Sequence, residues 1–572
     1  MRSPPPTTEP PSPPPRDWRS LAEAYPESGL TLPSDPCADE DEDLLFLFLS
    51  EREVFLKLTR HCNNRCRFCC DTVFWNGSNM DLDRVREKIA EGAQKGYQRL
   101  FLSGGEPTIH PDFLEIIRYG QSLGYVEIIT ITNGRRFYYP EFSRQAVEAG
   151  LTAVVVSVNS HDARTHDALV SVKGAFRQAR RGIQNLRRLG CPVNLSAVVN
   201  QQNVHQLPDM VRAYKKWGAG AATFMQLIPN DRDWARSRQV IYYELETGRG
   251  PVRQALAVAR DIGLAVEFKK FPDAFFEDYE EQIQEPLGWA LEVAEIAWRR
   301  PERYAPFRRG DAIQCHGARC EHCAYNNFCA YLMRHQSLRR EGAFDGFLLD
   351  TQRTPVPAAG PLCDALARQA AAAVHLSAPD VSALQPWLEA CADRPMSVRL
   401  ESVTGAGDLP GEITLVAQDD AQLDQLRDLP HALEVLLNTL TAPWLLRHSD
   451  WVAAKGSRLT LVPQLFLRLE TARQGQVALP PLLEALPLEA AQLRAIPPCF
   501  TGREDSGRLP HRVPGELLTP EEDIPAHARH YYWQHYFTRS ARCNGCRLRA
   551  QCDGIHINYV RQFGYRTLNP LT

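Results

Sequence analysis

Strand-like and helix-like patterns alternate from residue 53 to about residue 230, and this alternation constrains the fold more than any other feature of the sequence. Six apolar runs of strand length lie at residues 54–58, 99–103, 126–132, 153–158, 193–199 and 222–228. The helix-patterned stretches between them each stop at a glycine, as helices commonly do: Gly96, Gly124, Gly150, Gly190 and Gly218. Repeated β-then-α steps predict parallel strands joined by right-handed helical crossovers. The expected class is therefore α/β, with chemistry where strands end and loops begin.

Sixteen cysteines are unusual for a chain of 572 residues, and most are grouped at gaps of two to five residues. The N-terminus lacks the pattern of a secretion signal, and cytosolic thiols grouped in this way are metal ligands more often than disulfides. No apolar run reaches about eighteen residues, so we expect no membrane span and a cytoplasmic location. The net charge of −4 argues against a dominant nucleic-acid surface. Three single cysteines are expected to be ordinary core thiols: Cys191, Cys363 and Cys391.

The first cysteine group lies in the loop after the first strand-like run. Cys62, Cys66 and Cys69 follow the spacing C-x3-C-x2-C, with the aromatic Phe68 before the last thiol. Three thiolates can hold three corners of a four-iron cluster, which leaves one iron without a protein ligand. An open coordination position is typical of a catalytic centre. Cys70 could replace Cys69, although we favour Cys69, and a zinc knuckle or buried thiols remain the alternatives.

Polar motifs stand at the next three strand ends. Gly104–Pro107 reads Gly-Gly-Glu-Pro, 132–134 reads Thr-Asn-Gly, and Ser157 begins Ser-Val-Asn. Glycines allow a backbone to approach a ligand closely, and Glu106 offers a carboxylate or its backbone to a cationic amine. Each motif alone could be a turn or a cap. Arg135 and Arg136 could meet an anionic substrate, but a solvated surface is the expected place for them.

Together, these motifs resemble the radical SAM superfamily over residues 53 to about 230. The resemblance implies a partial (β/α)6 TIM-like barrel and a [4Fe-4S] cluster held by Cys62, Cys66 and Cys69. It also implies that S-adenosylmethionine (SAM) binds the open iron through its amino and carboxylate groups. The residues that it places against SAM are Gly104, Gly105, Glu106, Pro107, Asn133 and Ser157. The implied chemistry is reductive cleavage of SAM to a 5′-deoxyadenosyl radical, which abstracts hydrogen from a substrate.

Two later cysteine runs share the spacing C-x2-C-x5-C. The first comprises Cys315, Cys320, Cys323 and Cys329, and the second comprises Cys543, Cys546 and Cys552. Cys499 or His556 could supply the fourth ligand of the second run. Both runs resemble the auxiliary-cluster extensions called SPASM or Twitch, but Met333 and His556 stand where the final cysteine of that pattern would be. Two separate one-cluster modules fit better, so one or two auxiliary clusters are expected, with zinc ribbons as the alternative.

The sequence predicts five regions, of which the C-terminal part is expected to be α+β and rich in cysteine. They are a Pro-rich and acidic disordered tail (1–43), a radical SAM core (44–235), a helical extension with the first auxiliary cysteine run (236–340), an unassigned α+β region (341–490) and a second auxiliary region (491–572). Within the unassigned region, residues 396–403 and 412–416 are expected as strands and residues 423–440 as a helix.

Relatives with such extensions suggest a peptide or protein substrate, in the manner of enzymes that mature ribosomally made peptides. A reductase, flavodoxin or ferredoxin is the expected electron donor. A radical SAM enzyme of small-molecule or cofactor biosynthesis is the first alternative. A non-catalytic zinc-binding interaction protein is the alternative from another class, but it does not explain the Gly-Gly-Glu-Pro motif one β-α step after the cysteine loop.

Overall fold

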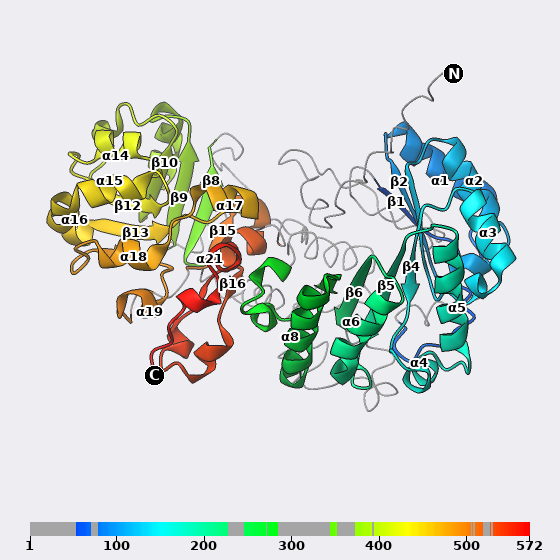
Figure 1. Ribbon diagram of the computed structural model, residues 1–572. Helices are drawn as coiled ribbons and strands as arrows, with labels where there is room; N and C mark the ends of the chain where they lie inside the picture. Colours follow the sequence, from blue (N-terminus) through cyan, green and yellow to red (C-terminus); the bar gives the residue numbers. More distant parts are fainter. Residues whose placement is uncertain are drawn as a thin grey trace, which may run out of the picture. The chain divides into compact units, whose positions relative to one another are not determined.

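The computed structural model describes residues 53–69, 78–226, 245–269, 271–283, 344–351, 372–391, 394–504, 506, 510–518, 527 and 530–572 (Figure 1). These fall into two units, of which the first takes its residues from 1–65, 71–157 and 177–193 and the second from 66–70, 158–176 and 194–572. Several predictions lie outside the described residues: the tail 1–43, Cys70, Cys363, and the run Cys315, Cys320, Cys323 and Cys329.

The first unit confirms the predicted parallel strands. Its strands are β1 (Glu53–Lys57), β2 (Arg99–Ser103), β3 (Glu127–Thr132) and β4 (Ala153–Ser157), and each pairs in parallel with the next in chain order. The helices that follow them are α1 (Leu82–Gln94), α2 (Phe113–Ser122), α3 (Pro140–Glu148) and α5 (Ala175–Arg188). Residues of β1 alternate between fully buried and half-buried, so one face of this strand is covered and the other is more open.

The sheet continues in the second unit with one strand more than the sequence predicted. Its strands are β5 (Val193–Val199), β6 (Ala221–Gln226) and β7 (Ala265–Lys269), and the strand order runs from β1 to β7 without a switch. Helices α4 (Ala163–Val170), α6 (Leu207–Lys216) and α8 (Leu245–Ile262) belong to this part. The expectation of mainly helical structure after residue 235 is correct for α8 and wrong for β7. Strand β7 is only five residues long, and a short apolar run does not distinguish a strand from a helix.

The five glycines predicted to end helices all have a left-handed backbone, with φ between 73° and 113°. At these values a side chain would be strained, so glycine is favoured. Helix α1 also has the expected start, because the Asp81 side chain accepts hydrogen bonds from the N–H groups of Asp83 and Arg84. The positions at which the sequence predicts these helices to end therefore have a direct physical cause.

The region after residue 344 is a second parallel sheet, and the α+β prediction for it is wrong. Its order is β14-β13-β12-β11-β10-β9-β8-β15, and every neighbouring pair runs in parallel. The strands are β8 (Gly346–Asp350), β9 (Ala373–Ala378), β10 (Met396–Leu400), β11 (Thr414–Ala417), β12 (Ala432–Leu437), β13 (Leu459–Pro463), β14 (Gln492–Leu493) and β15 (Arg512–Pro514). The helices among them are α13 (Gln385–Ala390), α14 (Asp420–Leu426), α15 (Thr441–Arg447), α16 (Ser449–Lys455), α17 (Leu469–Gly475), α18 (Leu479–Glu484) and α19 (Pro498–Thr501).

Two of the three element predictions in this region hold. Strands β10 and β11 match the expected strands near 396–403 and 412–416. The helix expected over 423–440 is wrong, because α14 ends at Leu426 and β12 begins at Ala432. Pro430 lies between them, and a proline disfavours helical backbone in the residue before it.

The second sheet is strongly curved. Glu434 on β12 is ion-paired with Arg494, at 2.8 Å, and with Arg512 on β15, at 3.7 Å. Four strands separate β12 from β15 in the sheet order, so this contact requires the sheet to bend back toward itself, as in a partial barrel. The side chain of Glu434 is only 7% exposed, and the paired guanidinium groups compensate its burial.

A small C-terminal module completes the second unit. Strands β16 (Phe537–Thr538) and β17 (Ile555–His556) form an antiparallel pair, followed by helix α21 (Ile557–Phe563). The segment after β7 lies against this module, because the Tyr536 hydroxyl donates a hydrogen bond to Asp273. Burial raises the pKa of Asp273 to about 6, while the Tyr536 hydroxyl and Arg561 act in the opposite direction. Among the helices of the described residues, none is both long and apolar enough to cross a membrane.

The raised pKa of Asp273 predicts a pH dependence of stability. The folded chain holds this proton more tightly than the unfolded chain, so the stabilisation is fully present below about pH 4 and is lost as the pH rises through about 6. Relative to Asp273→Asn, the wild-type protein should lose on the order of 2 kcal/mol of unfolding free energy over that range. Urea unfolding of both proteins at several pH values measures this difference, and parallel curves would contradict the assignment.

Candidate functional site

The loop that carries Cys62 is held by the two glycines that follow β2. The N–H of Gly105 donates to the Thr59 carbonyl at 2.7 Å, and the N–H of Glu106 donates to the His61 carbonyl at 2.7 Å. A Cβ at Gly105 would lie 2.2 Å from the His61 carbonyl oxygen, and one at Gly104, where φ is +117°, would lie 2.6 Å from that of Thr59. A side chain at either glycine would therefore displace the cysteine loop. In this structure, the group that approaches the two glycines closely is the backbone of the cysteine loop.

Glu106 joins this turn to the Thr-Asn-Gly turn after β3. Its Oε1 accepts hydrogen bonds from the Thr108 N–H (3.2 Å), the Thr108 hydroxyl (2.5 Å) and the Thr132 hydroxyl (2.6 Å). Its Oε2 accepts from the Asn133 N–H at 2.7 Å. The residue is 1% exposed, and burial raises the pKa of its carboxyl group while the four donors lower it. The carboxylate is thus an internal brace, and its predicted contact with an amine stays a prediction. Pro107 is buried beside it and begins a short 3-10 turn.

Asn133 and Arg135 reach from the Thr-Asn-Gly turn back to the cysteine loop. The Asn133 amide donates to the Asn63 side-chain oxygen at 2.6 Å, and its own oxygen accepts from the Arg135 N–H at 3.0 Å. The Arg135 guanidinium donates to the Asn63 carbonyl and, at 3.0 Å, to the Asn64 side chain. It also donates to Gln178 on α5 at 2.7 Å. Asn133 therefore supports the residues directly after Cys62.

The solvated surface predicted for the two arginines is wrong for Arg135, which is half-buried, and correct for Arg136, which is exposed. Arg135 is committed to the cysteine loop, and Arg136 donates to the Thr108 carbonyl at 2.8 Å and lies 4.6 Å from the centroid of the Phe142 ring. Sequence reasoning missed this role because a pair of arginines is usually a solvated charge. The signal that could have found it is their position directly after the Thr-Asn-Gly turn.

The three predicted cluster thiols are divided between the two units. Cys62, in the first unit, is half-buried, and its sulfur accepts from the Asn64 N–H at 3.4 Å. Burial raises the pKa of the metal-free Cys62 thiol to about 11. In the second unit, the Cys69 N–H donates to the Cys66 carbonyl, which forms a tight turn, and both residues are half-buried. Their joint ligation of one cluster stays a prediction. Iron would replace the thiol proton and so compensate the cost of an ionised sulfur there.

The motif after β4 also divides between the units. Ser157, the last residue of β4, is half-buried, and its contact with SAM stays a prediction. Asn159, in the second unit, is 3% exposed, and its hydrogen bonds go to nearby residues of the same unit. Its side-chain oxygen accepts from the Val198 N–H at 2.9 Å, and its carbonyl accepts from the Asn203 side chain at 2.8 Å. Asn159 is therefore a structural residue.

The second cysteine run lies in the C-terminal module, and Cys499 approaches it from α19. Burial raises the pKa of the Cys499 thiol to about 11, and the nearby Cys552 and Cys543 add to this increase. Cys543 is influenced in the same way by Cys552 and Cys546. Within the part of the chain that the structure describes, no three His, Cys, Asp or Glu side chains converge on a point that could hold a single metal ion. As a donor set, four neighbouring thiols fit an iron-sulfur cluster, in which each thiol binds a different iron.

His556, the other candidate for the fourth ligand, has both ring nitrogens in use. Nε2 bonds to the Tyr532 carbonyl at 3.1 Å, and Nδ1 accepts from the Asn558 N–H at the start of α21. The ring is 1% exposed, and burial lowers the pKa of His556 to about 4, so it is neutral at physiological pH. These contacts favour Cys499 as the fourth ligand of this centre. Cys191 and Cys391 are buried, as predicted for core thiols.

Comparison with known proteins agrees with the geometry of the first sheet. Residues 56–214 match the model of the radical SAM superfamily. This match identifies residues 56–214 as a radical SAM domain. The match runs from the end of β1 into α6 and includes the loops that carry the cysteine, Gly-Gly-Glu-Pro and Thr-Asn-Gly motifs. The radical SAM domain is therefore the part of the chain that holds the candidate site.

Two curated relatives are each similar to about a third of this chain. The AdoMet-dependent heme synthase of Methanosarcina barkeri is 32% identical over 183 residues, which are 32% of this chain and 52% of the relative. The PqqA peptide cyclase of Bradyrhizobium diazoefficiens is 28% identical over 162 residues, 28% of this chain and 42% of the relative. The chain thus spans about half the length of these relatives. The crystal structure of Streptococcus suis SuiB bound to S-adenosylmethionine aligns with a TM-score of 0.33 and 16% identity, over 40% of this chain and 52% of that one.

The Glu106 brace predicts a local effect of Glu106→Gln. A glutamine side chain has one accepting oxygen where a carboxylate has two. At least one of the donors from Thr108, Thr132 and Asn133 therefore loses its partner. Local opening of residues 104–106 and 132–134 should become easier by about 1–3 kcal/mol. Amide hydrogen exchange measures this change. Glu148→Gln, at an exposed ion pair on α3, is the control, and equal exchange in the two variants would contradict the brace.

Proposed function

We propose that the protein is a radical SAM enzyme that cleaves S-adenosylmethionine reductively and uses the resulting 5′-deoxyadenosyl radical to take a hydrogen atom from its substrate. The observation that carries this proposal is the interlocked turn system of the first sheet. Gly105 and Glu106 hold the loop that contains Cys62, and Glu106 and Asn133 fix the next turn against that loop. A loop fixed on two sides suits a cluster that must keep one iron open.

Cys62, Cys66 and Cys69 would hold the cluster, which when bound supplies one electron to the sulfonium of SAM. The chain's own contribution is to position the substrate and to exclude water. Arg135 and Asn133 keep the residues after Cys62 in place. Two strand ends of this parallel sheet, those of β2 and β4, carry the other residues proposed to contact SAM, and ligands of parallel sheets bind at such ends. These residues are Gly104, Gly105, Glu106, Pro107 and Ser157.

We propose a peptide or protein as the substrate. This rests on the similarity to the PqqA peptide cyclase, whose name states that it acts on a peptide. A small molecule is the second candidate, because the AdoMet-dependent heme synthase of Methanosarcina barkeri is also similar to this chain. A flavodoxin, a ferredoxin or a reductase is proposed as the electron donor, and one or two auxiliary clusters are proposed beside the first.

Removal of one thiol tests the proposed activity. The wild-type protein, reconstituted without oxygen, should bind about twelve irons if three four-iron clusters form, and it should release 5′-deoxyadenosine when given SAM and dithionite. Cys66→Ala should abolish that release and remove about four irons, since only the SAM-binding cluster loses a ligand.

Cys191→Ala is the matched control, because Cys191 is a buried thiol outside all three groups. Release of 5′-deoxyadenosine by Cys66→Ala would show that the ligand assignment is wrong. A colourless protein with zinc in place of iron would reject the enzyme in favour of the zinc-binding alternative.

A further inference from the structure

We infer that Glu277 is a positioning residue for the C-terminal thiol centre, and that it acts by fixing the turn that presents Cys543 and Cys546. The inference rests on the proposed function only in that it assigns an iron-sulfur cluster to these thiols. Glu277 lies in the segment after β7, about 260 residues before the turn in the sequence, and both belong to the second unit.

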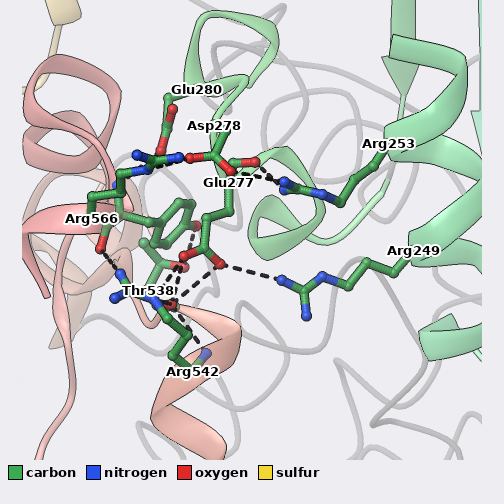
Figure 2. Close-up of polar contacts among 10 residues, drawn as sticks. Arg249, Arg253, Glu277, Asp278, Glu280, Thr538, Arg542 and Arg566 are labelled. Carbon is green, nitrogen blue, oxygen red and sulfur yellow. Dashed lines mark hydrogen bonds and ion pairs between the residues drawn. The ribbon is translucent and has the colours of Figure 1, made fainter. Parts of the chain in front are cut away.

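The Glu277 carboxylate is the centre of a buried polar network (Figure 2). It accepts from the Ser540 hydroxyl, 3.2 Å and 3.3 Å from its two oxygens, and from Nε of Arg542 at 2.9 Å. Nη2 of Arg249, on α8, lies 3.3 Å from Oε2. The side chain of Glu277 is only 9% exposed, so these contacts lie in a weakly screened environment and are stronger than surface ion pairs.

Two short links connect this carboxylate to the cysteines. Ser540 begins the 3-10 turn Ala541–Gly545, and its hydroxyl accepts from the Arg542 N–H at 3.1 Å. The Ser540 carbonyl accepts from the Cys543 N–H at 3.0 Å, and the Cys543 carbonyl accepts from the Cys546 N–H at 3.1 Å. Glu277 therefore holds the first residue of the turn and the residue directly before Cys543.

Other contacts attach the module without touching this turn. Asp278 pairs with Arg253 at 2.9 Å and with Arg566 at 2.6 Å, and Glu280 accepts from the Tyr565 N–H at 2.9 Å. The Thr538 hydroxyl bonds to the Tyr565 hydroxyl at 2.9 Å. Because these contacts remain in a Glu277 variant, the module is expected to stay attached. Asp278 thus offers a matched control: it is the neighbouring residue, carries the same charge and does not contact Ser540 or Arg542.

The charge of Glu277 also predicts an electronic effect. It balances Arg542, which is adjacent in sequence to Cys543. Without the carboxylate, the guanidinium charge is no longer compensated, which favours the reduced and more negative form of a nearby cluster. A neutral residue at 277 should therefore raise the reduction potential of the C-terminal centre. A merely structural role of Glu277 elsewhere in the fold would not produce this shift.

The test uses full-length Glu277→Gln beside Asp278→Asn, a substitution suited to the left-handed backbone at 278 (φ 71°). In the metal-free chain, hydrogen exchange of residues 541–546 should be about tenfold faster in Glu277→Gln and unchanged in Asp278→Asn. In the reconstituted protein, an electron paramagnetic resonance titration should show a higher midpoint potential in Glu277→Gln alone. The signal that disappears in Cys543→Ala identifies the C-terminal centre.

Equal exchange in the two variants, or a shift of potential that is the same in both, would overturn the inference. The exchange measurement needs no metal, so it tests the positioning role even if the protein binds zinc and the proposed enzyme function fails. Loss of SAM cleavage in Cys66→Ala tests that function separately.

Discussion

The contact between a glycine pair and the backbone of the cysteine loop is the constraint on which the candidate site depends. Gly104 and Gly105 have no side chains, so the Thr59 and His61 carbonyls can approach this turn closely. They accept hydrogen bonds at 2.7 Å from the N–H groups of Gly105 and Glu106, respectively. A single buried carboxylate, Glu106, then joins this turn to the next strand end. Buried charges are costly unless several donors satisfy them, so four donors to one carboxylate fix the relative placement of two loops. The geometry of the candidate site therefore depends on backbone contacts as well as on the thiols.

The two sheets follow the same plan. In each, seven parallel strands, β1 to β7 and β8 to β14, run in chain order without a switch. When every right-handed crossover advances in one direction, the helices gather on one face of a sheet, and the other face is free to curve. In the sequence, each set of strands also precedes a C-x2-C-x5-C run. After the first strand of the second sheet, the sequence has a single cysteine, Cys363, where the first sheet has a group of three. Glu434 contacts Arg494 and Arg512, and these ion pairs hold the curvature of the second sheet.

The sequence alone was informative where local chemistry has a period or a fixed spacing. The six strands, the helix-ending glycines and the order of the loop motifs could be predicted because apolar alternation, left-handed turns and cysteine spacing are local. Strand β12 was mistaken for helix because its apolar run is compatible with either state until neighbouring strands pair with it. The role of Arg135, the use of the Glu106 carboxylate as a brace and the contact of Glu277 with Ser540 could not be predicted. Each joins residues that are between 26 and 265 positions apart, and no local pattern records such contacts.

In the proposed function, the cysteine loop holds a cluster whose open iron binds S-adenosylmethionine directly. Electron-nuclear double resonance on the reduced, reconstituted protein, with SAM labelled with ¹⁵N in its amino group and ¹⁷O in its carboxylate, tests this claim most directly. We expect hyperfine coupling of both labels to a cluster that is lost in Cys62→Ala. A reduced cluster with no coupling to either label, under conditions where SAM is bound, would contradict it.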